Sequence, residues 1–217
     1  MIMGILKYTK TVLFFLLLLI PYFSWSEESV DGHAESWGQI QHEKVSAEIP
    51  KKNWSSIKVK NFGRIDEQYF RGAQPKNHDY EDLAALGIKT VITLTNSDTD
   101  PNEKVMVENA GMKYYQIPMD SHTPPADSQL AEFLRLVNDP ESYPVYVHCA
   151  AGKHRTGVMT AIYRMTKYRW TADQAYKEMK KYKFGLSFFH PKLKKYIYDY
   201  YRELTRASRT PSSQAPN

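Results

Sequence analysis

Short apolar runs and stretches of helical periodicity follow one another along the middle of this chain. Runs of the kind that form buried strands occupy residues 57–62, 68–71, 88–94, 112–118 and 145–148. Apolar side chains recur every three or four positions, as in helices with a buried face, in residues 78–86, 101–110, 127–137, 171–182 and 189–204. Strands alternating with helices predict an α/β fold, in which helices flank both faces of a central, mostly parallel sheet of four to five strands.

Local signals mark the ends of several predicted helices. Gly87 and Gly111 follow the first two, where glycine adopts the left-handed conformation that ends a helix. Residues 171–174 read Thr-Ala-Asp-Gln, a capping box, and Pro191 stands near the first turn of the last helix. One more helix is expected after residue 157, with a buried face made of Val158, Ala161, Ile162 and Met165.

The two ends of the chain lack this alternation. Lys7 and Lys10 precede an apolar run over residues 11–20, and Ser24 and Ser26 stand at the −3 and −1 positions of a cleavage site. We therefore expect residues 1–26 to be a signal peptide, with a retained N-terminal anchor as the alternative. The expected destination is the bacterial periplasm or the medium, without stable membrane association after cleavage.

The signal peptide is the first of four expected segments. Residues 27–53 are polar and predict a linker or N-terminal arm, and residues 54–205 hold the predicted folded, functional domain. Residues 206–217 are rich in serine and proline and predict a disordered tail.

Composition and net charge limit the classes of substrate and binding partner that are expected. The chain has 217 residues and a net charge of +5, from 29 Lys and Arg against 24 Asp and Glu. Cleavage after Ser26 would remove two lysines and no acid, which leaves 27 basic and 24 acidic residues, or +3. This mild charge suits an anionic substrate and does not call for a nucleic-acid partner. No metal-ligand spacing is recognisable, so neither a metal nor a cofactor is expected.

The candidate chemistry lies where the run 145–148 ends. Cys149, the single cysteine, stands six positions before Arg155, and small residues separate it from the next helix. A tight loop that opens a helix directs backbone N–H groups and the helix dipole at a phosphate group. Arg155 can hold two phosphate oxygens with its planar fork. The residues expected to bind phosphate are Ala150, Ala151, Gly152, Lys153, His154 and Arg155.

The same positive field would ionise the thiol of Cys149, which titrates near pH ~8.5 in a free cysteine. Thiolate attack on phosphorus would form a cysteinyl-phosphate, and water would hydrolyse it in a second step. We expect Thr156 to donate its hydroxyl to the sulfur and His148 to orient the loop through its ring N–H groups. Without Arg155 and Thr156 in register, Cys149 would be interpreted as a small buried hydrophobic residue.

The run Cys-x5-Arg-Thr-Gly resembles the signature of the protein tyrosine phosphatase superfamily, in its compact dual-specificity branch. Residues 69–75, Tyr-Phe-Arg-Gly-Ala-Gln-Pro, resemble a stretch near the start of many bacterial and fungal members, with Gly72 where serine is usual. Arg71 within this stretch is expected to pair with a carboxylate under the loop, or alternatively to contact substrate.

The resemblance implies an aspartate general acid roughly thirty residues before the cysteine. Asp120 lies 29 residues before Cys149 and follows a predicted strand. The rival is Asp127, 22 residues before, which is also well placed to cap the next helix. His122 is a further candidate proton donor, and an enzyme without an aspartate acid stays open.

The loop 152–157 is similar to those of atypical plant and fungal dual-specificity phosphatases, several of which act on inositol polyphosphates or pyrophosphates. It also resembles the lysine-bearing loop of the phosphoinositide phosphatase branch. Lys153 and His154 would add charge at the pocket rim, unless Lys153 pairs with a nearby acid. We expect a phytase-like phosphatase acting on inositol polyphosphates. A dual-specificity or tyrosine phosphatase acting on phosphoproteins is the first alternative, and an inactive phosphate-binding module or a sulfurtransferase is the other.

Overall fold

The computed structural model describes residues 57–97, 100–185 and 190–208. These residues all belong to one compact unit that spans Glu48–Asn217. The predicted signal peptide and N-terminal arm lie outside the described residues. No helix within the described ranges is long and apolar enough to cross a lipid bilayer.

A five-stranded sheet forms the centre of the domain, with strand order β1-β2-β5-β3-β4. Its strands are β1 (Gly63–Arg64), β2 (Tyr69–Ala73), β3 (Thr90–Thr93), β4 (Lys113–Gln116) and β5 (Val145–Cys149). The short β1 runs antiparallel to β2, and every other neighbouring pair is parallel. The predicted mostly parallel sheet is therefore confirmed.

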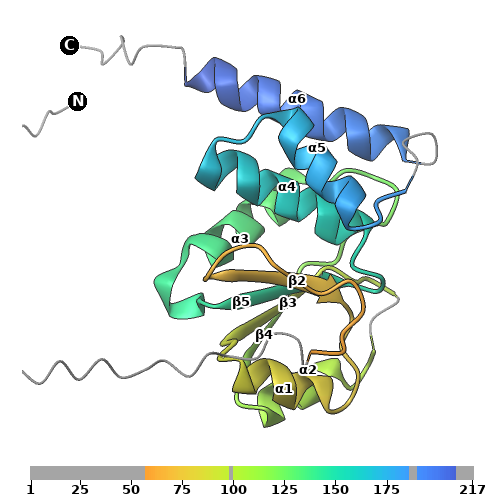
Figure 1. The fold of residues 1–217 in the computed structure, drawn as a ribbon, viewed down its shortest axis with the longest axis vertical. Coiled ribbons are helices and arrows are strands. Elements are labelled where there is room, and N and C mark those ends of the chain that lie inside the picture. The colour runs from red at the N-terminus through yellow and green to blue at the C-terminus, as the bar shows by residue number, and fades with distance from the viewer. Residues whose placement is uncertain (1–56, 98–99, 186–189, 209–217) are drawn as a thin grey trace, which may run out of the picture. The chain divides into compact units, whose positions relative to one another are not determined.

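Helices cover both faces of this sheet. They are α1 (Asp79–Ala85), α2 (Glu103–Asn109), α3 (Asp127–Asn138), α4 (His154–Tyr168), α5 (Ala172–Lys181) and α6 (Pro191–Ala207), and a 3-10 turn, η2, lies at Pro140–Ser142. In Figure 1, α1 and α2 lie on one side of the sheet, and α4, α5 and α6 are layered on the other.

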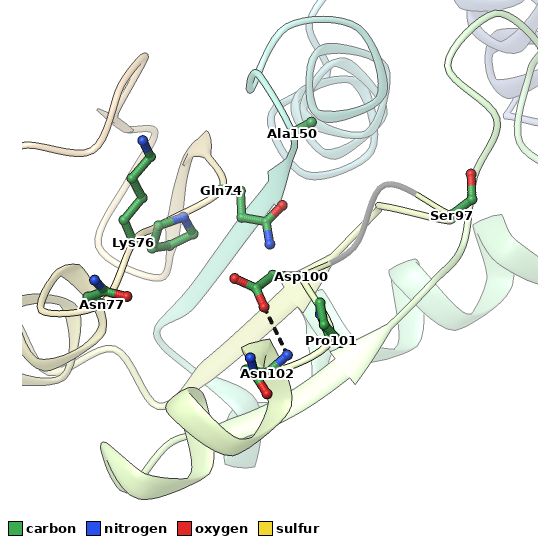
Figure 2. A pocket seen from close by; sticks show the side chains of 9 residues that line it. Gln74, Lys76, Asn77, Ser97, Asp100, Pro101, Asn102 and Ala150 are labelled. Atoms are coloured by element: carbon green, nitrogen blue, oxygen red, sulfur yellow. Dashed lines mark hydrogen bonds between the residues drawn. The ribbon is translucent and has the colours of Figure 1, made fainter.

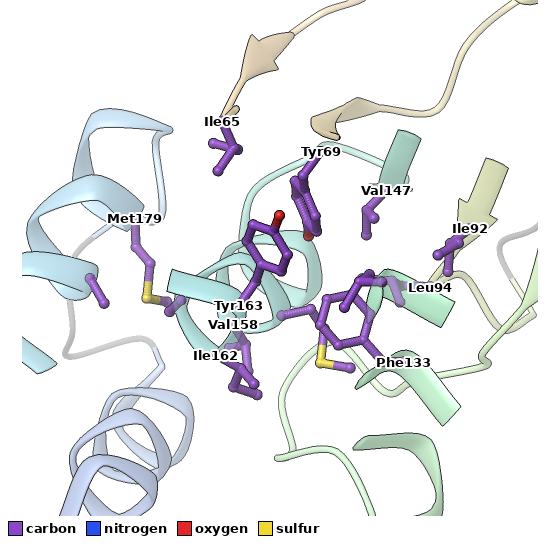
Figure 3. Close-up of a cluster of buried hydrophobic side chains, with 14 of the residues drawn as sticks. Ile65, Tyr69, Ile92, Leu94, Phe133, Val147, Val158, Ile162, Tyr163 and Met179 are labelled. Atoms are coloured by element: carbon purple, nitrogen blue, oxygen red, sulfur yellow. The ribbon is translucent and has the colours of Figure 1, made fainter. Parts of the chain in front are cut away.

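Two hydrophobic cores correspond to these two faces. The larger core joins the sheet to α3, α4, α5 and α6, and Figure 3 shows Val158, Ile162 and Tyr163 of α4 inside it. The smaller core joins the sheet to α1 and α2. Strand β5 supplies both, because alternate side chains of a strand point to opposite faces: Val147 enters the larger core and Tyr146 the smaller.

Most helix ends follow the local signals. Gly87 and Gly111 have φ values of 83° and 80° directly after α1 and α2. The hydroxyl of Thr171 accepts from the N–H of Gln174, and the Gln174 side chain accepts from the N–H of Thr171, so the capping box is confirmed. Pro191 is the first residue of α6.

Three expectations are wrong in detail. Residues 57–62 form no strand, because the chain turns at Asn61, which has a φ of 56°. Helix α4 is buried on nearly every side rather than on one face, since Met159 and Tyr163 are also inaccessible. Helix α6 continues to Ala207, so the chain is still helical where the tail was predicted to begin.

Candidate active site

The phosphate-sized loop leaves the sheet at its centre. β5 lies between β2 and β3, with Cys149 paired to Ala73 and His148 paired to Thr93. The loop therefore occupies the carboxyl edge of a parallel sheet, where folds of this class bind ligands. Cys149 is only 3% exposed, while Ala150 and Ala151 face solvent.

The environment of Cys149 favours its thiolate. Burial alone would raise the pKa of this thiol. Hydrogen bonding by the side chain and N–H of Thr156 and the charge of Arg155 outweigh that effect, so the pKa lies below its ordinary value. A hydrogen bond from the N–H of Lys153 acts in the same direction. These groups belong to the loop and to the first turn of α4.

Arg155 is buried beside the loop, with 6% of its surface exposed. Its Nη1 donates to the backbone oxygens of Leu94 and Met119, at 3.3 Å each. Leu94 follows β3 and Met119 lies beyond β4, so the guanidinium is positioned by the ends of two strands.

Gly152 allows the loop to close on the sheet. Its φ of 63° is in the left-handed region, and an added Cβ would lie 2.4 Å from the carbonyl carbon and oxygen of Gly72. The carbonyl oxygen of Gly152 accepts hydrogen bonds from Nδ2 of Asn61, at 2.7 Å, and from Nη2 of Arg71. Asn61 also donates to the carbonyl oxygen of Tyr182 at 2.9 Å. No local signal in the sequence marks Asn61 as part of the site, because its partners are 91 and 121 residues away.

Arg71 differs from its predicted role. It is fully buried, but it pairs with no carboxylate within the described residues. Instead it donates to the Gly152 carbonyl and lies over the ring of Tyr182, with 4.1 Å from its guanidinium carbon to the ring centroid. The adjacent Gly72 is explained by Tyr146, whose hydroxyl would lie 2.1 Å from a Cβ at that position.

His148 also differs from expectation. Its Nε2 lies 2.9 Å from Oε1 of Glu103, an oxygen that accepts a hydrogen bond from the hydroxyl of Tyr80 at 3.0 Å. The ring stacks on Tyr146 rather than on the loop. Neighbouring strand residues face opposite sides, so Cys149 points to the α4 side and His148 to the α1–α2 side. The fully buried Glu103 gave no signal in the sequence beyond helical periodicity.

The acid candidates lie in the loop between β4 and α3. The carboxylate of Asp120 is exposed and accepts the backbone N–H groups of His122 at 2.7 Å and Thr123 at 2.9 Å. The hydrogen bond from His122, together with that from Thr123, holds the pKa of Asp120 below its ordinary value. Asp127 is the first residue of α3 and makes no capping bond; Gln129 caps that helix by accepting the N–H of Ala126.

Three histidines lie together beside the loop, and we call them the histidine stack: His122, His154 and His190. The ring centroids of His154 and His190 are 3.7 Å apart, and those of His122 and His190 are 5.6 Å apart. Lys153 makes no ion pair within the part of the chain described, so the alternative that it pairs with an acid is not observed there. The described residues contain no cluster of metal-ligating side chains that could hold a metal ion.

A cavity of about 790 Å³ borders the loop at Ala150. Amide side chains of Gln74, Asn77 and Asn102 line it, with one basic and one acidic residue, Lys76 and Asp100. In Figure 2 the Gln74 amide points toward the Asp100 carboxylate. The cavity is thus polar, and its two charges are of opposite sign.

Comparison with known proteins identifies the family. Residues 56–215 match the Tyrosine phosphatase family, and the chain belongs to that family. The chain is 23% identical over 175 residues to the inositol diphosphatase SIW14 of Saccharomyces cerevisiae, which covers 76% of this chain and 60% of that protein. The predicted membership of the protein tyrosine phosphatase superfamily is therefore confirmed, and the protein is a phosphatase.

Solved structures show the same fold. The core catalytic domain of the PP-IP phosphatase SIW14 from S. cerevisiae, in complex with citrate, superposes with a TM-score of 0.58 at 21% identity. The match covers 70% of this chain and 96% of that one. TpbA of P. aeruginosa, in complex with pTyr, gives a TM-score of 0.57 at 23% identity and covers 71% and 93%.

Proposed function

We propose that this protein hydrolyses phosphate monoesters through a cysteinyl-phosphate on Cys149, with inositol polyphosphates as its substrates. The observation that supports the mechanism most directly is the buried thiol with a lowered pKa at the mouth of an Arg155-anchored loop. The thiolate attacks phosphorus, the phosphorus–oxygen bond to the leaving group breaks, and that oxygen takes a proton. Water then cleaves the sulfur–phosphorus bond, releasing phosphate and restoring the thiolate.

The substrate assignment draws on three observations. SIW14, to which the chain is similar, is named an inositol diphosphatase. Lys153 lies at the loop without an acidic partner in the described residues, which suits a substrate with several phosphates. The polar cavity beside Ala150 can take ring hydroxyl groups, because its amides both donate and accept hydrogen bonds. A tyrosine phosphatase is the second candidate, since TpbA has been crystallised with pTyr.

The protonation state of Asp120 decides whether it can give a proton to the leaving oxygen. The backbone N–H groups of His122 and Thr123 both bond Oδ1 of Asp120 and favour its ionised form, so they oppose protonation of this candidate acid. A pyrophosphate releases a phosphate anion, which needs little protonation, whereas an alkyl ester releases a far more basic alkoxide. Inositol polyphosphates are alkyl esters, so Asp120 or His122 would have to supply the proton that the leaving alkoxide takes.

Phosphate release from inositol hexakisphosphate and from a phosphotyrosine peptide, measured side by side, tests this proposal. Cys149→Ser is the blank, and it is expected to abolish turnover while retaining substrate binding. Faster release from the inositol supports the proposed substrate; faster release from the peptide supports a protein phosphatase. Phosphate trapped on Cys149 in an acid quench, seen by mass spectrometry, separates both from a sulfurtransferase, and no release from either substrate would indicate an inactive module.

We also propose that the protein is exported after cleavage behind Ser26, from the basic and apolar pattern of residues 1–26. N-terminal sequencing of protein recovered from the periplasm or medium should begin at Glu27. Recovery of intact chain in the membrane fraction would favour a retained anchor instead.

A further inference from the structure

The histidine stack brings together three segments that are distant in sequence. His122 belongs to the loop after β4, His154 is the first residue of α4, and His190 directly precedes α6. The rings of His122 and His190 are stacked at 30°, and those of His154 and His190 lie at 37°. The ring of Phe184, which follows α5, meets His154 edge-on at 5.4 Å and lies 5.6 Å from the ring of His190.

The stack lies beside the catalytic groups. His154 stands between Lys153 and Arg155 in the phosphate-binding loop. Arg155 donates to the carbonyl of Met119, three residues before His122, which ties the loop of His122 to the same arginine. A phosphate group bound next to the one attacked by Cys149 would therefore meet these imidazoles.

The charged and polar groups around the stack favour an anion. Lys153 approaches from α4, and from the loop after β4 the hydroxyl of Ser121 lies 2.8 Å from Nδ1 of His122. The only carboxylate that the interactions place near it in the described residues is Asp120, and two backbone N–H groups already hold that carboxylate. From the α5–α6 side, Phe184 contributes its ring and a backbone hydrogen bond to His154.

In the free protein two of these imidazoles, those of His154 and His190, are held largely neutral. Burial, then the neighbouring His190, lowers the pKa of His154 to about 4. Burial and His122 also lower the pKa of His190. Moreover, Nδ1 of His190 is buried and makes no hydrogen bond within the described residues. A ring in this state gains a strong partner when an anion arrives, because a protonated imidazole offers two N–H donors.

We propose that the histidine stack binds a second phosphate group of the substrate and takes up protons as that group binds. This inference rests on the proposed function, because a substrate with one phosphate cannot occupy both places. By linkage, a ligand that prefers protonated rings binds more tightly as pH falls, provided that the rings start neutral. The preference for a polyphosphate over a monophosphate should therefore increase from pH 8 towards about pH 6, near the ordinary pKa of histidine.

The variant His190→Gln tests the proposal in the mature chain. The measurement is kcat/KM for inositol hexakisphosphate divided by kcat/KM for phosphotyrosine, between pH 5.5 and 8. One charge-assisted hydrogen bond corresponds to roughly a tenfold change, so this ratio should fall roughly tenfold at the acidic end, and its pH dependence should flatten. His78→Gln is the matched control, because His78 is exposed at the start of α1 and its ring faces Glu81.

A binding measurement keeps the two hypotheses separate. Cys149→Ser is titrated calorimetrically with inositol hexakisphosphate in buffers of different ionisation enthalpy, with and without His190→Gln. Net proton uptake that His190→Gln reduces supports the stack as a phosphate site, whether or not the wild type turns the compound over. Failure of the wild type to release phosphate from it would refute only the proposed substrate.

Unchanged proton uptake in His190→Gln, or an equal loss of kcat/KM for both substrates, would refute the stack as a phosphate site. Should His190→Gln unfold, His122→Gln replaces it, since the His122 side chain is exposed. The same reduction in proton uptake is then required of it; the kcat/KM ratio is not used for this variant, because His122 is also a candidate proton donor.

Discussion

Asn61 should contribute to both stability and catalysis, although it lies far in sequence from every catalytic residue. Its amide donates to the carbonyl oxygens of Gly152, at 2.7 Å, and of Tyr182, at 2.9 Å. Because Asn61 has a φ of 56°, a change to alanine would add backbone strain to the loss of these bonds. Asn61→Gly avoids that strain and removes the amide alone.

The size of the effect follows from the two bonds. A net hydrogen bond contributes about 0.5–1.5 kcal/mol, so losing both should lower the free energy of unfolding by about 1–3 kcal/mol. The Gly152 carbonyl keeps Arg71 as a donor, whereas no other side-chain bond to the Tyr182 carbonyl is seen in the described residues. Asn61→Asp should be worse than Asn61→Gly, because it turns a carboxylate toward two carbonyl oxygens.

Urea unfolding and kcat on an aryl phosphate would measure the two consequences. Asn77→Gly is the control for the flexibility that glycine adds, because Asn77 also has a positive φ, 37°, and its side chain makes no hydrogen bond in the described residues. We expect Asn61→Gly to lose more stability than Asn77→Gly and to lower kcat as the loop loses one of its two carbonyl anchors. Equal stability losses in the two variants, with kcat unchanged, would refute this reasoning.

Three further predictions concern the loop and its neighbours. The alkylation rate of Cys149, plotted against pH, should have its midpoint below the ordinary ~8.5, because the lowered pKa keeps the thiolate until pH falls through the folded value. Thr156→Ala should raise that midpoint. A wild-type midpoint at or above the ordinary value contradicts the proposed activation. Asp120→Asn should slow alkyl phosphates far more than activated aryl phosphates, and equal slowing of both removes Asp120 from the acid role. Gly152→Ala should destabilise the fold by about 1–3 kcal/mol more than Gly111→Ala. Both positions have positive φ, but only Gly152 has backbone within 2.4 Å of the added carbon. Similar urea midpoints for the two variants would show that the loop can move aside.

Structural features that depend only on neighbouring residues could be predicted from the sequence. Helix ends at Gly87 and Gly111 and the capping box at Thr171 depend on partners within a few positions, so the sequence was sufficient to place them. The strand, loop and helix from 145 to 168 were also predictable from local sequence, because the hydrophobic periodicity changes from that of a strand to that of a helix on either side of the small loop residues. Alternation of strands with helices likewise implied a parallel sheet.

What the tertiary structure decided is which distant groups meet. The strand order brings the loop over β2, so Arg71 meets the Gly152 carbonyl instead of a carboxylate, and Asn61 joins it from a turn that was predicted as strand. The alternation of β5 turns His148 toward Glu103.

The histidine stack depends on tertiary structure for the same reason. Its three members lie up to 68 positions apart, from His122 to His190, and they meet because the loop after β4 and the starts of α4 and α6 come together in the fold. Local hydrogen bonds and periodicity are encoded by near neighbours. Contacts between segments depend on strand order and helix packing, which no single stretch of this sequence specifies.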